Sequence, residues 1–270
     1  MVLQLLWVKL MVPETKNIPL EEASSAKNDR ICRKLHLSPD DHILEIGTGW
    51  GGFAIHAAKN YGCRVTSTTI SREQYEYALQ RIHNEGLADR ITLLLKDYRD
   101  LEGQYTKLVS IEMIEAVGWQ YYPEFFNTCG RLLTEDGLAV LQAITIQDQN
   151  YEDAKRSVDF IQRYIFPGSC IPSMTALLSA ATEASSLKLF HFEDFAPHYA
   201  RTLREWRNRF QANANKIREL GYPEEFLRLW EFYFCYCEGG FAERSIGSTQ
   251  LTLTKPLCRM QPITPDIETL

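Results

Sequence analysis

The chain has 270 residues, of which 45% are hydrophobic and 24% are charged, as in a globular protein that buries a sizeable core. Its formal net charge of −6, with no basic run to offset it, argues against a nucleic-acid partner. Seven cysteines are scattered through the chain, and only Cys235 and Cys237 are close together. This spacing argues against a disulfide framework and a zinc site, and favours reduced thiols in a cytoplasmic protein with no metal.

The first twelve residues, MVLQLLWVKLMV, are apolar but include Lys9. The segment is too short to span a bilayer, which needs roughly 20 residues, and it lacks the features of a signal peptide. Two interpretations stay open. It is a strand or helix that docks on the protein, or a segment that lies on a membrane surface.

Alternating strands and helices are predicted along the first half of the chain. Helical spacing predicts a first helix over residues 20–35. Strands are predicted at 42–47, 63–70, 90–97, 107–114 and 137–146. The intervening helices are predicted at 51–62, 71–86 and 121–133, and Ser71 is the expected N-cap of the second. This order predicts an α/β fold with a parallel sheet and helices on both of its faces.

The alternation stops between residues 147 and 247. Helical stretches are predicted there at 153–165, 175–186, 202–220 and 224–241, joined by the loops FPGSCIPS and FEDFAPHYA. A last strand is predicted at 248–256. The simplest organisation is a single domain over residues 1–270, with an α/β core at 20–145, a mainly helical insertion at 146–247 and a returning strand.

A glycine-rich loop, LEIGTGWGGFA, follows the first predicted strand and opens a helix. Gly47, Gly49 and Gly52 have the spacing that lets a backbone approach a nucleotide cofactor, although dinucleotide enzymes share it. A nicotinamide dinucleotide site expects an acid about 20 residues further on, where this chain has only hydroxyls in TSTTIS. Glu45 precedes the loop, and its carboxylate suits a ligand with an ammonium group. S-adenosylmethionine is therefore favoured over NAD, while packing glycines and a helix-capping Glu45 remain the simpler alternatives.

The other cofactor contacts are expected at the carboxyl ends of the next two strands, where open α/β sheets bind ligands. Thr69, Ser71 and Gln74 lie within reach of a ribose at the end of the second strand. Asp97 and Tyr98 end the third strand, where an acid can accept from an adenine amino group and a ring can cover the base. Asp97 is equally well explained as a solvated turn residue.

Two glutamates, Glu112 and Glu115, lie where the fourth predicted strand ends. Buried carboxylates are costly unless they are paired or hydrogen-bonded. Both side chains are expected near the cofactor cleft, as candidates for chemistry or for local hydrogen bonding.

Six segments together resemble the cyclopropane fatty acid synthase family, which includes the mycolic acid cyclopropane synthases. They are ILEIGTGWGGFAIHAA, VTSTTISREQ, SIEMIEAVG, YIFPGSCIPS, HYARTLREWRNRF and CEGGFAERSIGSTQLTL, and they span about residues 20–256. Many methyltransferases share the first segment, whereas the YIFPG and HYARTL blocks are far more specific to this family.

The resemblance implies a class I methyltransferase (Rossmann-like) sheet whose helical insertion binds the substrate. It also implies transfer of the methyl group of S-adenosylmethionine to the double bond of an unsaturated fatty acyl chain, carried by a phospholipid or an acyl carrier. Such a protein is expected in the cytoplasm, in peripheral contact with a membrane. Two alternatives stay open: a methyltransferase of another small molecule or lipid, and a homologue that binds cofactor or lipid without catalysis.

Methyl transfer to an alkene leaves a carbocation, which aromatic faces can stabilise. Candidates to line the acyl channel are Tyr164, Phe166, Trp206, Phe210, Trp230, Phe232, Tyr233 and Phe234. For any single one of them, a place in the helical core is the simpler interpretation. Loss of a proton from the new methyl group then closes a cyclopropane, whereas a prior hydride shift gives a branched product.

In the family the proton acceptor is thought to be a bound bicarbonate. The resemblance places Glu115, Tyr199 and the backbone amide of Ile144 at matching positions of this anion site. Gln142 stands where better-known members have a histidine, and its amide can still donate to an anion. Ala116 stands where those members have a second histidine.

The family cysteine is expected shortly before the helix at residue 20. Residues 11–19 read MVPETKNIP and offer no cysteine, and the helical N-terminal region of the family is not found in this sequence. Cys237 is a candidate substitute.

Overall fold

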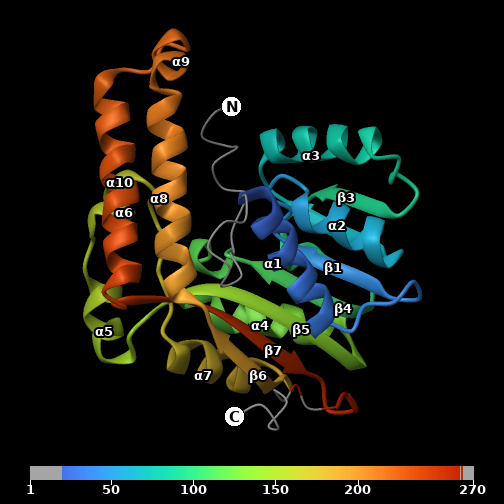
Figure 1. The fold of residues 1–270 in the computed structure, drawn as a ribbon. Coiled ribbons are helices and arrows are strands. Elements are labelled where there is room, and N and C mark those ends of the chain that lie inside the picture. Colours follow the sequence, from blue (N-terminus) through green and yellow to red (C-terminus); the bar gives the residue numbers. More distant parts are fainter. Residues whose placement is uncertain (1–19, 262, 264–270) are drawn as a thin grey trace, which may run out of the picture.

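The computed structural model describes residues 20–261 and 263, so the expectations for residues 1–19 lie outside the described residues. A seven-stranded sheet with the order β3-β2-β1-β4-β5-β7-β6 forms the centre of the molecule (Figure 1). The strands are β1 (His42–Ile46), β2 (Arg64–Thr69), β3 (Ile91–Leu95), β4 (Tyr105–Ile111), β5 (Leu133–Ile146), β6 (Lys188–Asp194) and β7 (Ile246–Thr254). Strands β1 to β5 are parallel, as predicted, and β7 is antiparallel to both of its neighbours.

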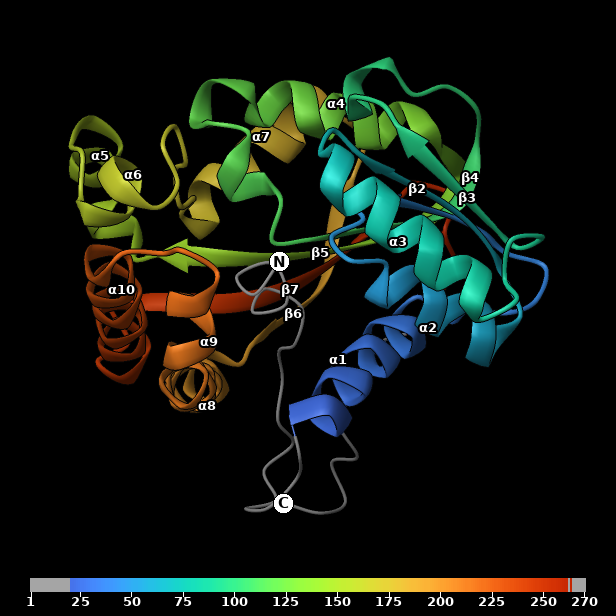
Figure 2. The same ribbon diagram turned by 90° about the horizontal axis from the view of Figure 1, so that it is seen from above.

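Helices cover both faces of the sheet, and a further group lies beyond one end of it. The helices are α1 (Leu20–Lys34), α2 (Gly52–Tyr61), α3 (Arg72–Asn84), α4 (Tyr122–Leu132), α5 (Asp148–Arg156), α6 (Phe160–Tyr164), α7 (Met174–Ala184), α8 (Ala196–Ala212), α9 (Ala214–Glu219) and α10 (Glu224–Ala242). Figure 2 shows α1, α2 and α3 on one face, α4 and α7 on the other, and α8 to α10 at the far ends of β5 and β7.

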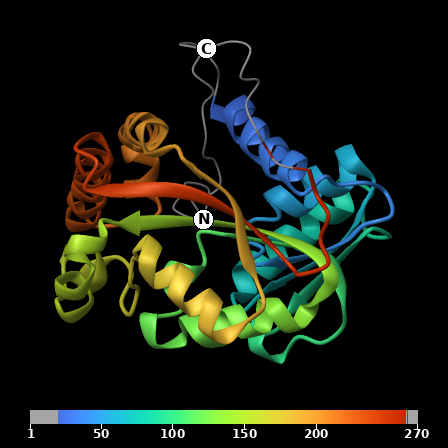
Figure 3. The same cartoon turned by 90° about the horizontal axis from the view of Figure 1, so that it is seen from below.

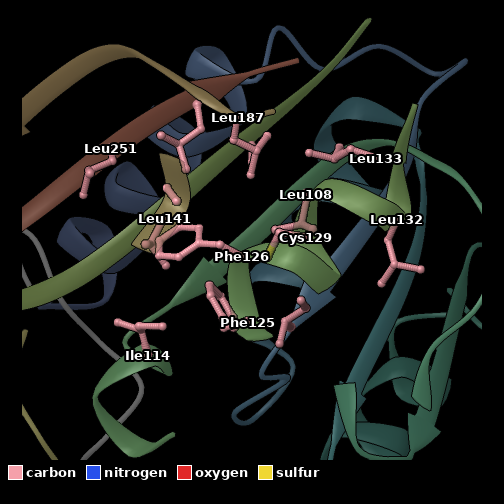
Figure 4. Packing of buried hydrophobic residues seen from close by; sticks show 14 of the residues in the cluster. Leu108, Ile114, Phe125, Phe126, Cys129, Leu132, Leu133, Leu141, Leu187 and Leu251 are labelled. Carbon is pink, nitrogen blue, oxygen red and sulfur yellow. The ribbon is translucent and has the colours of Figure 1, made fainter. Parts of the chain in front are cut away.

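The two faces of the sheet bury separate apolar clusters. On the α4 side, Phe125 and Phe126 pack against Leu108 and Leu141 of the strands (Figure 4). The opposite face buries residues of β1, β2, β4 and β5 under α1, α2 and α3. Each large apolar side chain buried in this way contributes about 1.5–3 kcal/mol of transfer free energy. The two clusters therefore fix the strand ends that build the site.

A third cluster holds the helices beyond the sheet. It contains Tyr199, Trp206 and Phe210 of α8 and Phe234 and Phe241 of α10. Ile144 and Ile246, near the ends of β5 and β7, pack against it. This contact joins the helical part to the carboxyl end of β5.

One strand is missing from the prediction. Residues 188–194 were expected in a helical insertion and a loop, but they form β6, the edge strand beside β7 (Figure 3). Most side chains of β6 are partly or fully exposed, and a register shift between Leu189 and His191 interrupts its two-residue alternation. The predicted insertion is thus interrupted, because α7 packs on α4 and β6 extends the sheet before α8 begins.

Two predicted helices are each divided. The stretch predicted at 153–165 forms α5 and α6, since Asp159 makes a capping box with Gln162 and starts a new helix. The stretch predicted at 202–220 forms α8 and α9, which meet at Asn213, where the amide of the side chain donates to the backbone oxygen of Arg209.

Candidate active site

The glycine loop connects β1 to α2 at the carboxyl edge of the sheet. Gly47, Gly49 and Gly51 have φ angles of 98°, 52° and 78°, which favour glycine. The N–H groups of Gly47 and Thr48 both donate to the backbone oxygen of Thr68, so the loop is bound to the end of β2. A Cβ atom on Gly47 would lie 3.2 Å from the side chain of Met113, whereas one on Gly49 would meet open space. The described residues therefore leave open space beside the backbone of Gly49.

Glu45 is the penultimate residue of β1, two residues before Gly47. Its side chain is 2% exposed, and it accepts a hydrogen bond of 2.5 Å from the hydroxyl of Ser67 on β2. Burial raises the pKa of Glu45 to about 8, opposed by the Ser67 hydrogen bond and the charge of Lys27 on α1. A cationic ligand group beside this carboxylate would favour its ionised form.

The three polar residues predicted at the end of β2 lie together. The Thr69 hydroxyl donates to Oε1 of Gln74 at 2.9 Å and accepts from the backbone N–H of Ser71 at 3.1 Å. The hydroxyl of Ser71 caps α3 by accepting from the backbone N–H of Gln74, which confirms the predicted N-cap. This group presents hydroxyl and amide groups suited to a ribose.

Asp97 and Tyr98 follow β3. The carboxylate of Asp97 accepts from the backbone N–H of Arg99 and from its guanidinium, at 2.8–3.0 Å. The hydrogen bonds from the Arg99 side chain hold the pKa of Asp97 below its usual range, although partial burial opposes this. Tyr98 is half-buried, and its ring packs edge-on against Phe125 with centroids 5.6 Å apart. Asp97 is thus a turn residue paired with Arg99, as the simpler interpretation predicted.

Glu115 lies in a short 3-10 turn, Ile114–Ala116, just after β4. Its Oε1 accepts a hydrogen bond of 2.5 Å from the backbone N–H of Ile144 on β5. Its Oε2 is buried and has no hydrogen-bond partner among the described residues. Burial and the nearby charge of Glu112 raise the pKa of Glu115 to about 8. Glu115 therefore carries a proton over much of the neutral range.

Tyr199 projects from α8 into the third cluster. Its ring lies 4.6 Å from that of Phe241, and its hydroxyl, like Oε2 of Glu115, is buried without a partner in the described part of the chain. Ile144, whose N–H binds Glu115, packs against the same cluster. A protonated Glu115 and the Tyr199 hydroxyl are both O–H donors, so they fit the small anion that the family resemblance implies.

Gln142 and Glu112 form a pair across β5 and the end of β4. Nε2 of Gln142 donates to Oε1 of Glu112 at 2.6 Å, and the backbone N–H of Glu112 donates to the oxygen of Gln142 at 2.8 Å. Burial raises the pKa of Glu112, while Lys27 and the Gln142 amide oppose the increase. The side chain of Gln142 is 0% exposed, and its Oε1 accepts from Gln250 on β7 at 2.9 Å. Gln142 therefore has two side-chain partners within the protein.

The sequence did not indicate that Lys27 and Ser67 lie beside the buried glutamates, or that Gln142 is the partner of Glu112. Lys27 is buried on α1, where burial lowers its pKa, although the charges of Glu112 and Glu45 oppose the decrease. A signal was present, because Lys27 lies seven residues after the buried Leu20, on the same face of the helix.

The candidate channel aromatics divide into three groups. Trp206, Phe210 and Phe234 are buried core residues, as the simpler interpretation held. Tyr164 and Phe232 are exposed by 57% and 52%. The remaining three, Phe166, Trp230 and Tyr233, are partly buried. The ring of Tyr233 contacts the rings of both Phe166 and Trp230.

Cys237 on α10 is hydrogen-bonded to Tyr233, and burial raises the pKa of the thiol to about 12. The thiol is therefore neutral at physiological pH. Among residues 20–261 and 263, no group of three or more His, Cys, Asp or Glu side chains is placed to hold a metal ion. In the same residues, no helix is both long and apolar enough to cross a bilayer.

Residues 12–251 match the family model described as mycolic acid cyclopropane synthetase. The chain belongs to this family. It is similar to the tuberculostearic acid methyltransferase UfaA1 of Mycobacterium tuberculosis, with 38% identity over 236 residues, which cover 87% of this chain and 55% of that protein. It is 36% identical over 237 residues to the cyclopropane-fatty-acyl-phospholipid synthase of Escherichia coli K12, covering 87% of this chain and 59% of that protein. The chain thus spans little more than half the length of these curated relatives.

Solved structures of the mycolic acid cyclopropane synthetase family have the same fold. The cyclopropane synthase MmaA2 of Mycobacterium tuberculosis superimposes with a TM-score of 0.85 at 26% identity, covering 94% of each chain. The mycolic acid cyclopropane synthase CmaA1, complexed with SAH and CTAB, gives a TM-score of 0.82 at 29% identity, covering 88% of this chain and 86% of that one. These likenesses confirm the predicted family and the class I methyltransferase fold.

Proposed function

We propose that the chain is an S-adenosylmethionine-dependent C-methyltransferase that acts on the double bond of unsaturated fatty acyl chains. Family membership and the names of the two relatives support this reaction class. The observation that carries the proposal is that two buried oxygens of the candidate anion site, Oε2 of Glu115 and the hydroxyl of Tyr199, have no partner among the described residues. Burial of such groups is costly unless a ligand satisfies them.

The cofactor is assigned to the carboxyl ends of β1, β2 and β3. Backbone at Gly47 and Gly49 would face the methionine part, and Glu45 would accept from its ammonium group. Thr69, Ser71 and Gln74 would hold the ribose, and Asp97 and Tyr98 the adenine. The SAH-bound structure of CmaA1 supports a ligand of this class.

In the proposed reaction the π electrons of the alkene attack the methyl carbon of the sulfonium, and the sulfur leaves as a neutral thioether. Exclusion of water would favour this step, because a weak nucleophile must be held in line without competing water. The resulting carbocation then loses a proton. Bicarbonate, when bound, would supply the base, and Glu115 and Tyr199 would hold it through their O–H groups.

The acyl chain is assigned to a phospholipid in a bilayer, with an acyl carrier as the alternative donor. An exposed aromatic group on α6 and α10 supports peripheral contact with lipid, since Tyr164, Phe232 and Tyr236 are 57%, 52% and 47% exposed. Phe160 contacts all three rings, so they form one surface. Aromatic side chains are common where proteins meet the membrane interface.

The test is methyl transfer from cofactor with a trideuterated methyl group to vesicles of a monounsaturated phospholipid, with saturated vesicles as the substrate control. Mass spectrometry should find two deuterium atoms in the product if the proton leaves the new methyl group, and three if it leaves the acyl chain. Glu115→Gln should reduce the rate on the order of a hundredfold, because the anion that accepts the proton would no longer be held by the O–H group of Glu115. The exposed Glu102→Gln is the matched control. Absence of label from lipid, with a folded protein that binds cofactor, would contradict the proposed substrate.

A further inference from the structure

A continuous row of buried hydrogen bonds crosses the sheet beneath α1. Nζ of Lys34 donates to Oε1 of Gln250 at 2.7 Å, and Nε2 of Gln250 donates to Oε1 of Gln142 at 2.9 Å. Nε2 of Gln142 then donates to Glu112 at 2.6 Å. Gln142 and Gln250 are register partners on β5 and β7, and both are 0% exposed. The row therefore joins α1 to the end of β4 through the core of the sheet.

The two ends of the row determine its direction. An ammonium group can only donate hydrogen bonds, so Gln250 must turn its oxygen to Lys34 and its nitrogen to Gln142. Gln142 must then accept through its oxygen, which leaves its nitrogen for the carboxylate of Glu112. Each amide has one orientation that satisfies both neighbours, and reversal of either would bury unmatched groups at a cost of about 1–3 kcal/mol.

The row ends at a strained residue beside the cofactor loop. Glu112 has a φ of 51°, in the left-handed region that is unfavourable for residues other than glycine. The next residue, Met113, contacts the position that a side chain on Gly47 would occupy. Lys27 and Tyr233 lie within electrostatic range of the same carboxylate. Glu112 is thus held where the glycine loop, α1 and α10 meet.

We propose that Gln142 and Gln250 are positioning residues that hold Glu112 ionised and in one orientation at the cleft. There its carboxylate stabilises the positive charge of the cofactor's sulfonium and then that of the carbocation. This inference rests on the proposed function, and it gives Gln142 a role other than direct anion binding. Charges fixed in advance in a site of low dielectric stabilise a developing charge more strongly than water does.

A binding experiment tests the charge without any turnover. S-adenosylmethionine carries a sulfonium, whereas S-adenosylhomocysteine is a neutral thioether, so the ratio of their dissociation constants reports the effect of the cationic centre. Glu112→Gln should weaken binding of the sulfonium relative to the thioether on the order of tenfold. An unchanged ratio would overturn the inference, as would a wild-type chain that binds neither ligand.

A reciprocal exchange separates positioning from simple structural support. In the double variant Glu112→Gln with Gln142→Glu, the carboxylate is at position 142. The side-chain amide nitrogens at positions 112 and 250 can both donate to it, so folding should be retained while the charge moves one strand away. We expect thermal stability near that of the wild type, kcat reduced on the order of a hundredfold, and the altered ligand ratio of the single variant. Recovery of wild-type kcat and ligand ratio would overturn the inference.

The row itself is tested by Gln250→Leu, with Thr252→Val as the control. Thr252 lies two residues along β7 and is buried, and its hydroxyl has no partner among the described residues. Gln250→Leu should lower kcat several-fold and alter its pH profile, whereas Thr252→Val should change neither. Equal effects of the two variants would overturn the role of the row. If the ligand ratio responds but no lipid is methylated, the proposed function and the role of Glu112 toward the carbocation fail, and only its effect on the sulfonium stands.

Discussion

Glu112 and Glu115 lie three residues apart, yet their surroundings act differently on the charge of each carboxyl. Glu112 receives the amide of Gln142 and faces Lys27, both of which favour its ionised form. Glu115 has a single backbone N–H on one oxygen, and the charge of Glu112 adds to the effect of burial. Burial raises the pKa of both carboxyls, but only at Glu112 do an ammonium and a side-chain amide oppose the increase, so Glu115 is the one that retains a proton more readily.

This difference predicts how stability depends on pH at residue 115. The pKa of Glu115 is about 8 in the folded protein against 4.5 in the unfolded chain, so folded protein holds a proton that unfolded protein has lost between these values. Stability from this group is fully present below pH 4.5 and is lost as pH rises through 8. Glu115→Gln should remove that loss. The free energy of unfolding of the variant, measured relative to that of the wild type, should therefore rise on the order of 1–3 kcal/mol from pH 5 to pH 8.

Urea unfolding at the two pH values, without cofactor, measures this gain. Glu102→Gln, at an exposed position, should give equal differences at both pH values. A Glu115→Gln variant whose stability fell with pH as steeply as that of the wild type would show that Glu115 is already ionised in the folded state.

At the scale of elements, the first half of the chain was predictable because each element agrees with its local pattern. Ser71 caps α3 where the capping pattern indicated, and Gly62 ends α2 in a left-handed conformation. Strand β6 was not predictable because its residues do not alternate in burial and its partner, β7, begins more than fifty residues later in the sequence. Edge strands of this kind are specified by their neighbours more than by their own sequence.

The glycine loop offers a prediction about backbone and contact. Gly47→Ala and Gly86→Ala both place a side chain at a left-handed φ, of 98° and 68°, and each should cost about 1 kcal/mol of stability. Only the first also meets a neighbour, since its Cβ would lie 3.2 Å from Met113, whereas Gly86 has open space. Gly47→Ala should therefore lose cofactor binding as well.

Denaturant unfolding and calorimetric titration with S-adenosylhomocysteine would separate these effects. Gly86→Ala should bind like the wild type, because Gly86 follows the end of α3, away from the loop. If the two variants bound equally well, the loop would not be the cofactor contact that its sequence indicates.

At the scale of the whole molecule, the unpredicted part of the site consists of contacts between distant segments. The sequence indicated Glu115 and Gln142 individually, but the hydrogen bond from Gln250 to Gln142 joins residues 108 positions apart. Such a partner depends on strand order and register, and a single-residue shift of β7 would turn Gln250 to the opposite face of the sheet. Residue types near strand ends can be read from a sequence, whereas their pairing requires the assembled sheet.

The same dependence on assembly applies to the ion pairs that join α1 to the edge strand. Glu193 on β6 accepts from Nε of Arg30 at 2.8 Å and from Nζ of Lys34 at 2.6 Å. Although burial opposes the change, these hydrogen bonds lower the pKa of Glu193 to about 2. Because the folded pKa is depressed, the stabilisation is present above pH 4.5 and is lost as pH falls through 2.

Glu193→Gln should therefore destabilise the protein by about 2 kcal/mol at pH 7, since it leaves the buried ammonium of Lys34 without its carboxylate. The difference from wild type should shrink as pH falls toward 2, where the wild-type carboxylate also becomes neutral. Glu21→Gln is the matched control, because Glu21 on α1 pairs with Arg209 and both side chains are about half exposed. Loss of this exposed ion pair should cost less than about 1 kcal/mol of stability. Equal losses in the two variants at pH 7 would mean that the α1–β6 pair stabilises the fold no more than an exposed ion pair does.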